Sequence, residues 1–230
     1  MLNTPEEVRL FYRKTYAEHG PSPRGMAWGD TKTHYKRVMR IHHLLVSLDV
    51  PMNRILDVGC GVGLVHNLWG LAYKERTYHG VDLVPEFIEE ARAGISKDPK
   101  AIVVCEDFMD WVNIDPFSVA LGIGTFAWQT SDAVRSMLYK MWGMVGASGA
   151  LAVTLIPDNP LPMNEVRRLK GTLDAKEMLL YNGYSDRLDE HIVILVKKDA
   201  ETLAAEAMRL EEMKDATYDV IREQYEHAHS

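Results

Sequence analysis

Cysteine is scarce in this sequence, whose 230 residues include only Cys60 and Cys105, and no C-x-x-C pair occurs. Two cysteines are too few for the disulfide framework of a small secreted domain. Long apolar runs are also missing, since no stretch approaches the ~20 residues that a membrane-spanning helix needs. The first residues, MLNTPEEVRLFYRK, are charged and lack the apolar segment of a signal peptide. We therefore expect a cytoplasmic protein that does not associate with membranes.

Internal repeats, low-complexity tracts and long Gly/Ser/Pro linkers are absent as well, so the chain is expected to fold as one compact unit. Its composition, 47% hydrophobic and 26% charged, is that of an ordinary globular protein and excludes the disordered and fibrous classes. At about 150 residues per domain, the length fits one large domain or one domain with an appendage.

The net charge of −7 comes from 33 acidic and 26 basic residues. Such a chain lacks the positive field that drives non-specific binding to nucleic acids, so nucleic acid is not favoured as a partner. Residues 1–50 nevertheless carry eight basic and five acidic side chains, whereas residues 199–230 carry nine acidic and three basic ones. The basic segment is either a solvated helix face, which is the commoner case, or a local contact for a phosphate or carboxylate.

The first fifty residues predict two helices. One covers Pro5–Tyr16, with Thr4 as its N-cap and Glu7 three residues on. The other covers about Thr31–Leu48, with apolar residues at helical spacing. Between them, His19–Asp30 contains two prolines and three glycines and is expected to be a loop.

From residue 54 the pattern changes to strands that alternate with helices. Four of the five predicted strands are continuous apolar runs, as expected where helices cover both faces of a parallel sheet. The alternation predicts a doubly wound α/β fold. The predicted strands are Arg54–Gly59, Thr77–Leu83, Ala101–Asp107, Ser118–Gly124 and Gly149–Ile156, and the helices are one through Val65 and Leu68, Pro85–Ile95, and Ser131–Trp142 capped by Ser131 or Asp132.

Beyond Pro162 the pattern predicts a helix over Asn164–Leu180 and then two strands, Tyr184–Leu188 and His191–Lys198. The tail from residue 200 to about residue 225 has the apolar stripe of a helix. Such a stripe packs on the parent domain or forms a dimer contact, so a monomer and a homodimer both stay open.

The most informative motif is LDVGCGVG, which runs from Leu56 to Gly63. Gly59, Gly61 and Gly63 lie between a predicted strand and a predicted helix, where a tight turn and a close approach of the backbone to a ligand require residues without Cβ. Asp82 ends the next predicted strand, 23 positions beyond Gly59. A carboxylate at that point can accept both ribose hydroxyls of an adenosine.

Two classes of ligand bind at such a turn. A dinucleotide places its pyrophosphate at the helix N-terminus, usually with G-x-G-x-x-G spacing. Here the spacing is G-x-G-x-G, and Asp57 lies two residues before the first glycine. A carboxylate there would repel a pyrophosphate but suits a ligand that carries an ammonium and a sulfonium, which favours S-adenosylmethionine over NAD.

LDVGCGVG resembles motif I of the class I, Rossmann-like S-adenosylmethionine-dependent methyltransferases, and the similar region runs from about Arg54 to Lys198. The resemblance implies S-adenosylmethionine as cofactor and a seven-stranded sheet of order 3-2-1-4-5-7-6, with strand 7 antiparallel. It also divides the chain into an N-terminal helical lid or substrate segment (1–50), a core that binds S-adenosylmethionine (51–198) and a C-terminal helix (199–230).

The resemblance implies roles for the residues of the glycine-rich turn. The backbone of Gly59, Cys60 and Gly61 would pass under the methionine part of the cofactor, with Asp57 orienting that part. Asp57 alternatively does no more than cap the turn.

The resemblance also implies an adenosine site at the ends of the second and third strands. Asp82 would bind the ribose and Leu83 would pack on the adenine. Asp107 and Phe108 would flank the adenine, with the carboxylate receiving its exocyclic amine. The alternatives are that Asp82 caps the following helix and that Phe108 is a core residue.

The acceptor side departs from part of the family. Amino-methyltransferases of nucleic acids and proteins often carry Asn/Asp-Pro-Pro-Tyr after the fourth strand, whereas this chain has GIGTFAWQTS over residues 122–131. That departure speaks against methylation of the exocyclic amine of adenine and, with the acidic net charge, favours a small-molecule acceptor. Gly122, Ile123 and Gly124 would lie beside the methyl-transfer centre. The residues expected on the acceptor side are Thr125, Phe126, Trp128 and Gln129, although Phe126 and Trp128 are equally well explained as packing for the next helix.

The N-terminal segment is expected to close over the cofactor. Its candidate lid residues are Tyr16, Arg24, Trp28, Lys36 and Arg37, and an arginine or lysine among them would hold the methionine carboxylate. We assign no catalytic base, because a general base is needed only when the nucleophile carries a proton of high pKa. No metal site is predicted.

Two other functions stay open at this point. A binding or regulatory protein would keep the adenosine pocket without turnover. An NAD-dependent oxidoreductase would use the same layout for a dinucleotide.

Overall fold

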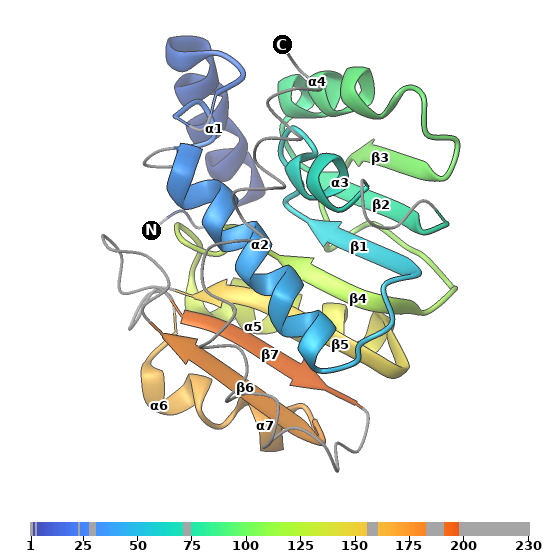
Figure 1. The fold of residues 1–230 in the computed structure, drawn as a ribbon. Helices are drawn as coiled ribbons and strands as arrows, with labels where there is room; N and C mark the ends of the chain where they lie inside the picture. The colour runs from blue at the N-terminus through green and yellow to red at the C-terminus, as the bar shows by residue number, and fades with distance from the viewer. Residues whose placement is uncertain are drawn as a thin grey trace.

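The computed structural model describes residues 2, 4–22, 24–27, 31–70, 75–155, 161–182 and 191–197, which fold into one seven-stranded sheet flanked by helices (Figure 1). The strands are β1 (Arg54–Val58), β2 (Thr77–Asp82), β3 (Ala101–Cys105), β4 (Phe117–Gly122), β5 (Val145–Leu155), β6 (Glu177–Asn182) and β7 (His191–Val196). The helices are α1 (Pro5–His19), α2 (Thr31–Ser47), α3 (Leu64–Trp69), α4 (Pro85–Ile95), α5 (Ser131–Met144), α6 (Met163–Val166) and α7 (Leu169–Thr172).

The strand order is β3-β2-β1-β4-β5-β7-β6, which confirms the predicted Rossmann-like topology. β1 to β5 pair in parallel, and β7 is antiparallel to both β5 and β6. β1 lies between β2 and β4, so the strand order reverses at its carboxyl end. Ligands of open α/β sheets bind at such a switch point.

Both faces of the sheet are buried. Ile55 and Val119 face a core cluster that they share with α2, α3 and α4, whereas Leu56 and Ala120 face a second cluster that includes α5. In Figure 1, α2 and α3 lie in front of the sheet and α5 lies behind it. This two-sided burial explains why the strands are continuous apolar runs.

The N-terminal helices form as predicted. The Thr4 hydroxyl accepts a hydrogen bond from the Glu7 backbone N–H at 3.1 Å, and the Glu7 carboxylate accepts one from the Thr4 N–H at 3.2 Å. This capping box starts α1 at Pro5. At α5, the N-cap is Thr130 rather than Ser131 or Asp132.

The predicted helix over Asn164–Leu180 is wrong in its second half. After α6 and α7, Asp174 takes a left-handed conformation with φ 52°, and the next residues form β6. Every residue of β6 pairs with β7, from Glu177 opposite Val196 to Asn182 opposite His191. Cross-strand pairing thus decides the conformation of an apolar run whose local pattern also fits a helix. The predicted strand Tyr184–Leu188 and the predicted C-terminal helix over residues 199–230 lie outside the described residues.

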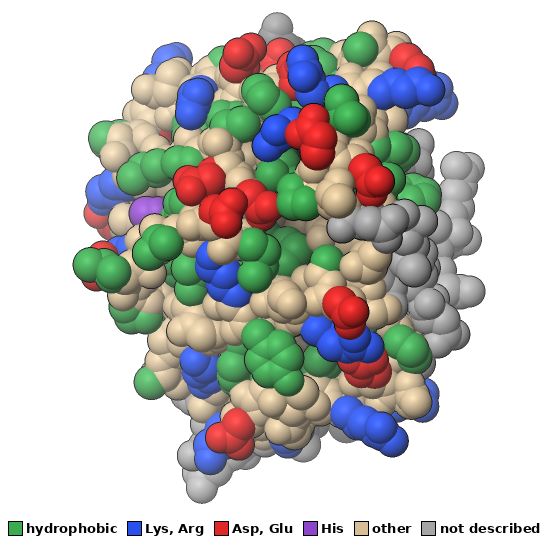
Figure 2. All heavy atoms as spheres, turned by 180° about the vertical axis from the view of Figure 1, so that it is seen from behind, with side chains coloured by type: hydrophobic (Ala, Val, Ile, Leu, Met, Phe, Trp, Pro, Cys, Tyr) green, Lys and Arg blue, Asp and Glu red, His purple; other side chains and the backbone are tan. Residues whose placement is uncertain are grey.

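None of the described helices combines the length and the apolar character that a membrane-spanning helix requires. On the face shown in Figure 2, acidic and basic side chains are interspersed among hydrophobic ones. No continuous positive surface is visible on that face.

Candidate functional site

A cavity of about 360 Å³ lies at the carboxyl ends of the central strands. Its strand-end wall consists of Asp57–Gly61, Asp82–Val84 and Glu106–Met109, which follow or end β1, β2 and β3. Facing residues come from the N-terminal segment and from the region between β4 and the middle of α5. We call the N-terminal group, which consists of Leu2, Thr4, Pro5, Val8, Tyr12, Met26, His34 and Val38, the N-terminal wall.

The glycine-rich turn is the most constrained part of the strand-end wall. Gly59, Gly61 and Gly63 have φ values of 71°, 53° and 80°, a region that side chains with Cβ avoid. The Gly59 N–H donates to the Val81 carbonyl at 2.8 Å. A Cβ at Gly59 would lie 2.6 Å from Thr125 Oγ1. Glycine at this position therefore permits the turn and also leaves room for the Thr125 side chain.

Asp82, the last residue of β2, holds the glycine-rich turn by hydrogen bonds. Its Oδ2 accepts the Gly61 N–H and its Oδ1 accepts the Val84 N–H, both at 2.9 Å. Burial raises the pKa of this carboxyl to about 6, although the backbone N–H groups oppose the shift. Asp82 therefore organises the turn and also presents a carboxylate to the cavity.

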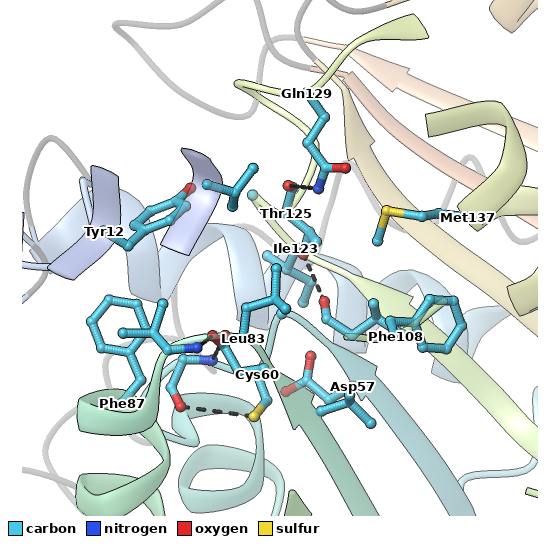
Figure 3. Close-up of a pocket in the computed structure, with 18 of the residues that line it drawn as sticks. Tyr12, Asp57, Cys60, Leu83, Phe87, Phe108, Ile123, Thr125, Gln129 and Met137 are labelled. Atoms are coloured by element: carbon cyan, nitrogen blue, oxygen red, sulfur yellow. Dashed lines mark hydrogen bonds between the residues drawn. The ribbon is translucent and has the colours of Figure 1, made fainter. Parts of the chain in front are cut away.

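Asp57 is 2% exposed and lies on the cavity floor with Cys60 (Figure 3). Burial raises its pKa to about 7, while a hydrogen bond from the Tyr78 hydroxyl at 2.6 Å acts in the opposite direction and the Asp82 charge adds to the increase. Burial also raises the pKa of the Cys60 thiol. A cation in the cavity would stabilise the ionised form of Asp57.

The segment after β3 brings Asp107 and Phe108 to the cavity together. Asp107 Oδ1 accepts the Met109 N–H at 2.8 Å, and its backbone carbonyl accepts the N–H groups of Asp110 and Trp111. Phe108 is 4% exposed and packs in the core, as one interpretation predicts. It also lines the cavity, and its contact with adenine stays a prediction.

Residues after β4 divide between cavity and core. Ile123, Gly124, Thr125 and Gln129 line the cavity. The Thr125 hydroxyl donates to the Val58 carbonyl at 2.6 Å, and the Gln129 amide donates to the Thr125 carbonyl at 3.0 Å (Figure 3).

Three predicted site residues at the end of β4 or after it do not line the cavity. Phe126 is fully buried in the core, and a Cβ at Gly122 would lie 2.8 Å from its ring, so Gly122 makes room for Phe126. Trp128 is 43% exposed and packs against the ring of Phe11, with 5.5 Å between the ring centroids. For Phe126 the packing interpretation is therefore correct, whereas Trp128 contacts α1 rather than the next helix.

The N-terminal segment contributes to the cavity wall, but with other residues than those predicted. Tyr16 packs on Phe87 and donates its hydroxyl to Glu90 at 2.9 Å, outside the cavity. Arg24 is exposed, and Lys36 and Arg37 are absent from the cavity wall. Trp28 lies outside the described residues.

The cavity is instead lined by Tyr12, Met26 and His34, none of which was among the predicted site residues. Burial lowers the pKa of His34 to about 3, so its imidazole is neutral. The available signal was the helical spacing itself, because Val8 and Tyr12 are four residues apart, as are His34 and Val38.

The charged residues of the cavity wall are all acidic. They are Asp57, Asp82, Glu106 and Asp107, and the described lining contains neither lysine nor arginine. Such a wall favours a cationic ligand and disfavours a pyrophosphate.

Comparisons with known proteins agree with this geometry. Residues 55–149 match the family model described as a methyltransferase domain. The chain is 27% identical over 159 residues to thiocyanate methyltransferase 1 of Brassica oleracea, a match that covers 66% of this chain and 68% of the relative.

Two solved structures have the same fold. One is magnesium protoporphyrin IX methyltransferase from Synechocystis PCC 6803 with bound S-adenosylmethionine, at 14% identity and a TM-score of 0.65, covering 84% of this chain and 97% of that one. The other is 1,6-didemethyltoxoflavin-N1-methyltransferase from Burkholderia thailandensis with bound S-adenosylhomocysteine, at 15% identity and a TM-score of 0.66, covering 85% of this chain and 91% of that one.

Proposed function

We propose that the chain is a class I S-adenosylmethionine-dependent methyltransferase that acts on a small molecule carrying neither a phosphate nor a carboxylate group. The observation that carries this proposal is the charge of the cavity wall. Four acidic residues and no basic one among the described lining suit a cationic cofactor but offer no ion pair to an anionic group of an acceptor.

The residues of the strand-end wall fit S-adenosylmethionine. Asp82 would accept ribose hydroxyls, and Asp107, whose Oδ1 accepts the Met109 N–H, would receive the adenine amine at Oδ2. Asp57 would balance the cationic methionine part, above the glycine-rich turn. When bound, the cofactor supplies a methyl group activated by its sulfonium.

The protein's own contribution to the reaction is to position the acceptor and exclude water. The N-terminal wall is largely apolar, and the polar groups near it are the Thr125 hydroxyl, the Gln129 amide and the neutral His34 imidazole. An acceptor held by such groups is oriented for in-line displacement without an ion pair. The names of the relatives, which refer to thiocyanate, a porphyrin and a toxoflavin precursor, support a small-molecule acceptor.

The cofactor is tested by calorimetric titration. We expect micromolar binding of S-adenosylhomocysteine and no binding of NAD. Replacing Asp82 by Ala should weaken S-adenosylhomocysteine by roughly 1.5–3 kcal/mol, because a charge-assisted contact is lost. An unchanged affinity of Asp82→Ala would refute the role of Asp82, and tight binding of NAD would refute the cofactor.

The acceptor class is tested by a turnover screen with S-adenosylmethionine. Thiols, phenols and heterocyclic amines form one set, and matched analogues that add a carboxylate or phosphate form the other. The proposal predicts turnover in the first set and at least about tenfold lower kcat/KM for the charged analogues, since their anions find no cationic partner. Preference for the charged analogues would overturn it, and binding of S-adenosylmethionine without turnover of any compound would favour a regulatory protein.

A further inference from the structure

Lys140 of α5 makes three hydrogen bonds to a single segment of backbone. Its Nζ donates to the carbonyls of Phe108 and Met109 at 2.7 Å each and to that of Trp111 at 2.6 Å. An ammonium has three donors, so one lysine uses all of them on the segment that follows β3.

The same segment carries two residues of the strand-end wall. Asp107 Oδ1 and its backbone carbonyl hold the N–H groups of Met109, Asp110 and Trp111, so the segment folds back around Asp107. The Lys140 Nζ also lies 5.0 Å from the centre of the Phe108 ring. Three carbonyls that point at one place repel one another unless a cation lies between them, so Lys140 fixes the shape of the segment.

Lys197 provides an internal comparison. Its Nζ donates to the carbonyls of Trp142 and Val145 at 2.9 and 2.6 Å and lies 4.7 Å from the centre of the Trp142 ring. The chemistry matches that of Lys140, but Lys197, Trp142 and Val145 do not line the cavity. Only one of the two lysines therefore shapes a ligand-binding surface.

We propose that Lys140 is a positioning residue for base recognition: it holds the segment Asp107–Trp111 in the shape that presents the Asp107 carboxylate and the Phe108 ring to the adenine. The proposal rests on the proposed function, because it requires an adenosyl ligand in the cavity. Lys140 itself is not part of the cavity wall, so its effect on the ligand is transmitted through the backbone of the segment.

The test compares two ligands and four variants by calorimetry. S-adenosylhomocysteine offers Asp107 an exocyclic amine, whereas S-inosylhomocysteine has a carbonyl oxygen at that position and should be rejected by the carboxylate. The ratio of the two affinities therefore measures base recognition. Asp107→Ala defines the ratio expected when recognition is lost.

Lys140→Gln should weaken S-adenosylhomocysteine by about tenfold and lower the ratio most of the way to the Asp107→Ala value, because the carboxylate is no longer held in place. Lys197→Gln, the matched control, should lower the thermal midpoint and leave the ratio unchanged. Lys140→Arg keeps the charge, but its planar fork fits three convergent carbonyls poorly, so an intermediate ratio is expected.

A wild-type ratio in folded Lys140→Gln, or in Lys140→Arg if the first variant does not fold, would overturn the proposal. Equal losses in the Lys140 and Lys197 variants would also overturn it, because they would show a general loss of stability. If the wild-type protein binds neither ligand, the proposed function fails instead, and the two failures are distinguishable.

Discussion

The strand-end wall and the N-terminal wall enclose the same cavity but are built differently. Hydrogen bonds to backbone groups fix the strand-end wall. The Gly59 N–H donates to the Val81 carbonyl, and the Asp82 carboxylate accepts the Gly61 N–H. In the N-terminal wall, the residues up to the end of α1 are attached by the N-terminus and by side chains, whereas Val38 of α2 packs in the core. The Leu2 N–H donates to the Trp128 carbonyl at 2.7 Å, and Arg9 donates to the Leu83 carbonyl at 3.2 Å.

This difference separates two tasks. A wall fixed by the sheet can discriminate between ligands, because its donors and acceptors do not move when a ligand arrives. A helix such as α1, none of whose residues is buried, can open at little cost, as a cofactor needs in order to enter. We therefore expect substitutions in the strand-end wall to change cofactor affinity, and substitutions in the N-terminal wall and its contacts to change exchange rates and use of the acceptor.

The largest effect should come from Gly59→Ala, measured against Gly63→Ala. Both glycines have positive φ, so both variants carry roughly 1–2 kcal/mol of backbone strain. Only at Gly59 does the new Cβ collide, 2.6 Å from Thr125 Oγ1, whereas at Gly63 its closest neighbour is the Ala91 side chain at 3.5 Å. We expect Gly59→Ala to lose at least about a hundredfold in affinity for S-adenosylhomocysteine, and Gly63→Ala to lose far less.

A double-mutant cycle identifies the cause of that loss. Thr125→Ala removes Oγ1 and Cγ2, the two closest atoms, and leaves only Cβ at 3.1 Å. The cost of Gly59→Ala should therefore be smaller in the Thr125→Ala background. Additive losses would show that the collision with Thr125 is irrelevant and that backbone strain alone acts.

The strand-end wall could be predicted from the sequence because its residues follow one another at fixed offsets from strand ends. Gly59, Asp82 and Asp107 need only the alternation of strands and helices to be brought together. The N-terminal wall could not be predicted in this way, since Tyr12 and His34 reach the cavity through packing of α1 and α2. Charge suggested Arg24, Lys36 and Arg37 instead, but a buried apolar wall selects residues by shape and not by charge.

The sheet shows the same limit. β1 to β5 could be predicted from apolar runs between turn signals, whereas β6 could not, because Glu177–Asn182 becomes a strand through its pairing with β7. The same holds for Phe126, whose burial depends on the space left by Gly122. In each case a partner distant in the sequence decides the outcome.

The pH dependence gives the next largest effect. The free protein holds Asp57 with a pKa of about 7, raised by burial from 3.8, and a bound cation should lower it. Affinity for S-adenosylmethionine should therefore fall by about fivefold as pH drops from 7 to 6, because one proton must leave on binding. The free energy of unfolding of the free protein should change in the opposite direction. Because the pKa of Asp57 is higher in the folded state than in the unfolded chain, folding favours the protonated carboxyl. Stability is therefore lost as pH rises from about 4 to about 7.

Calorimetry and thermal unfolding across pH 5–8 check both trends. In Asp57→Asn the affinity step near pH 7 should vanish, leaving a smaller one from Asp82, whose pKa is about 6. If Asp57→Asn keeps the step near pH 7, the proton is released elsewhere and Asp57 does not face the cation.

A smaller effect on the cofactor is expected at Gln129. Its amide donates to the Thr125 carbonyl at 3.0 Å, and its backbone pairs with that of Leu2. Gln129→Ala should change the affinity for S-adenosylhomocysteine by less than about threefold, because the strand-end wall is untouched, while raising the acceptor KM several-fold. A loss of cofactor affinity as large as that of Asp82→Ala would contradict the separation between the walls.

The smallest effect should come from Arg13→Ala. Arg13 Nε and Glu86 Oε1 lie 2.8 Å apart and join α1 to α4, with side chains that are 51% and 30% exposed. Exposed pairs of this kind contribute about 0.2–1 kcal/mol, so the dissociation rate of S-adenosylhomocysteine should rise by no more than about fivefold. Lys100→Ala removes another exposed pair, with Glu75, far from the cavity wall, and should leave that rate unchanged. Because the two variants lose the same kind of contact and differ only in place, a faster rate in Arg13→Ala alone would identify α1 as the part that opens, and equal rates would mean that the cofactor leaves by another route.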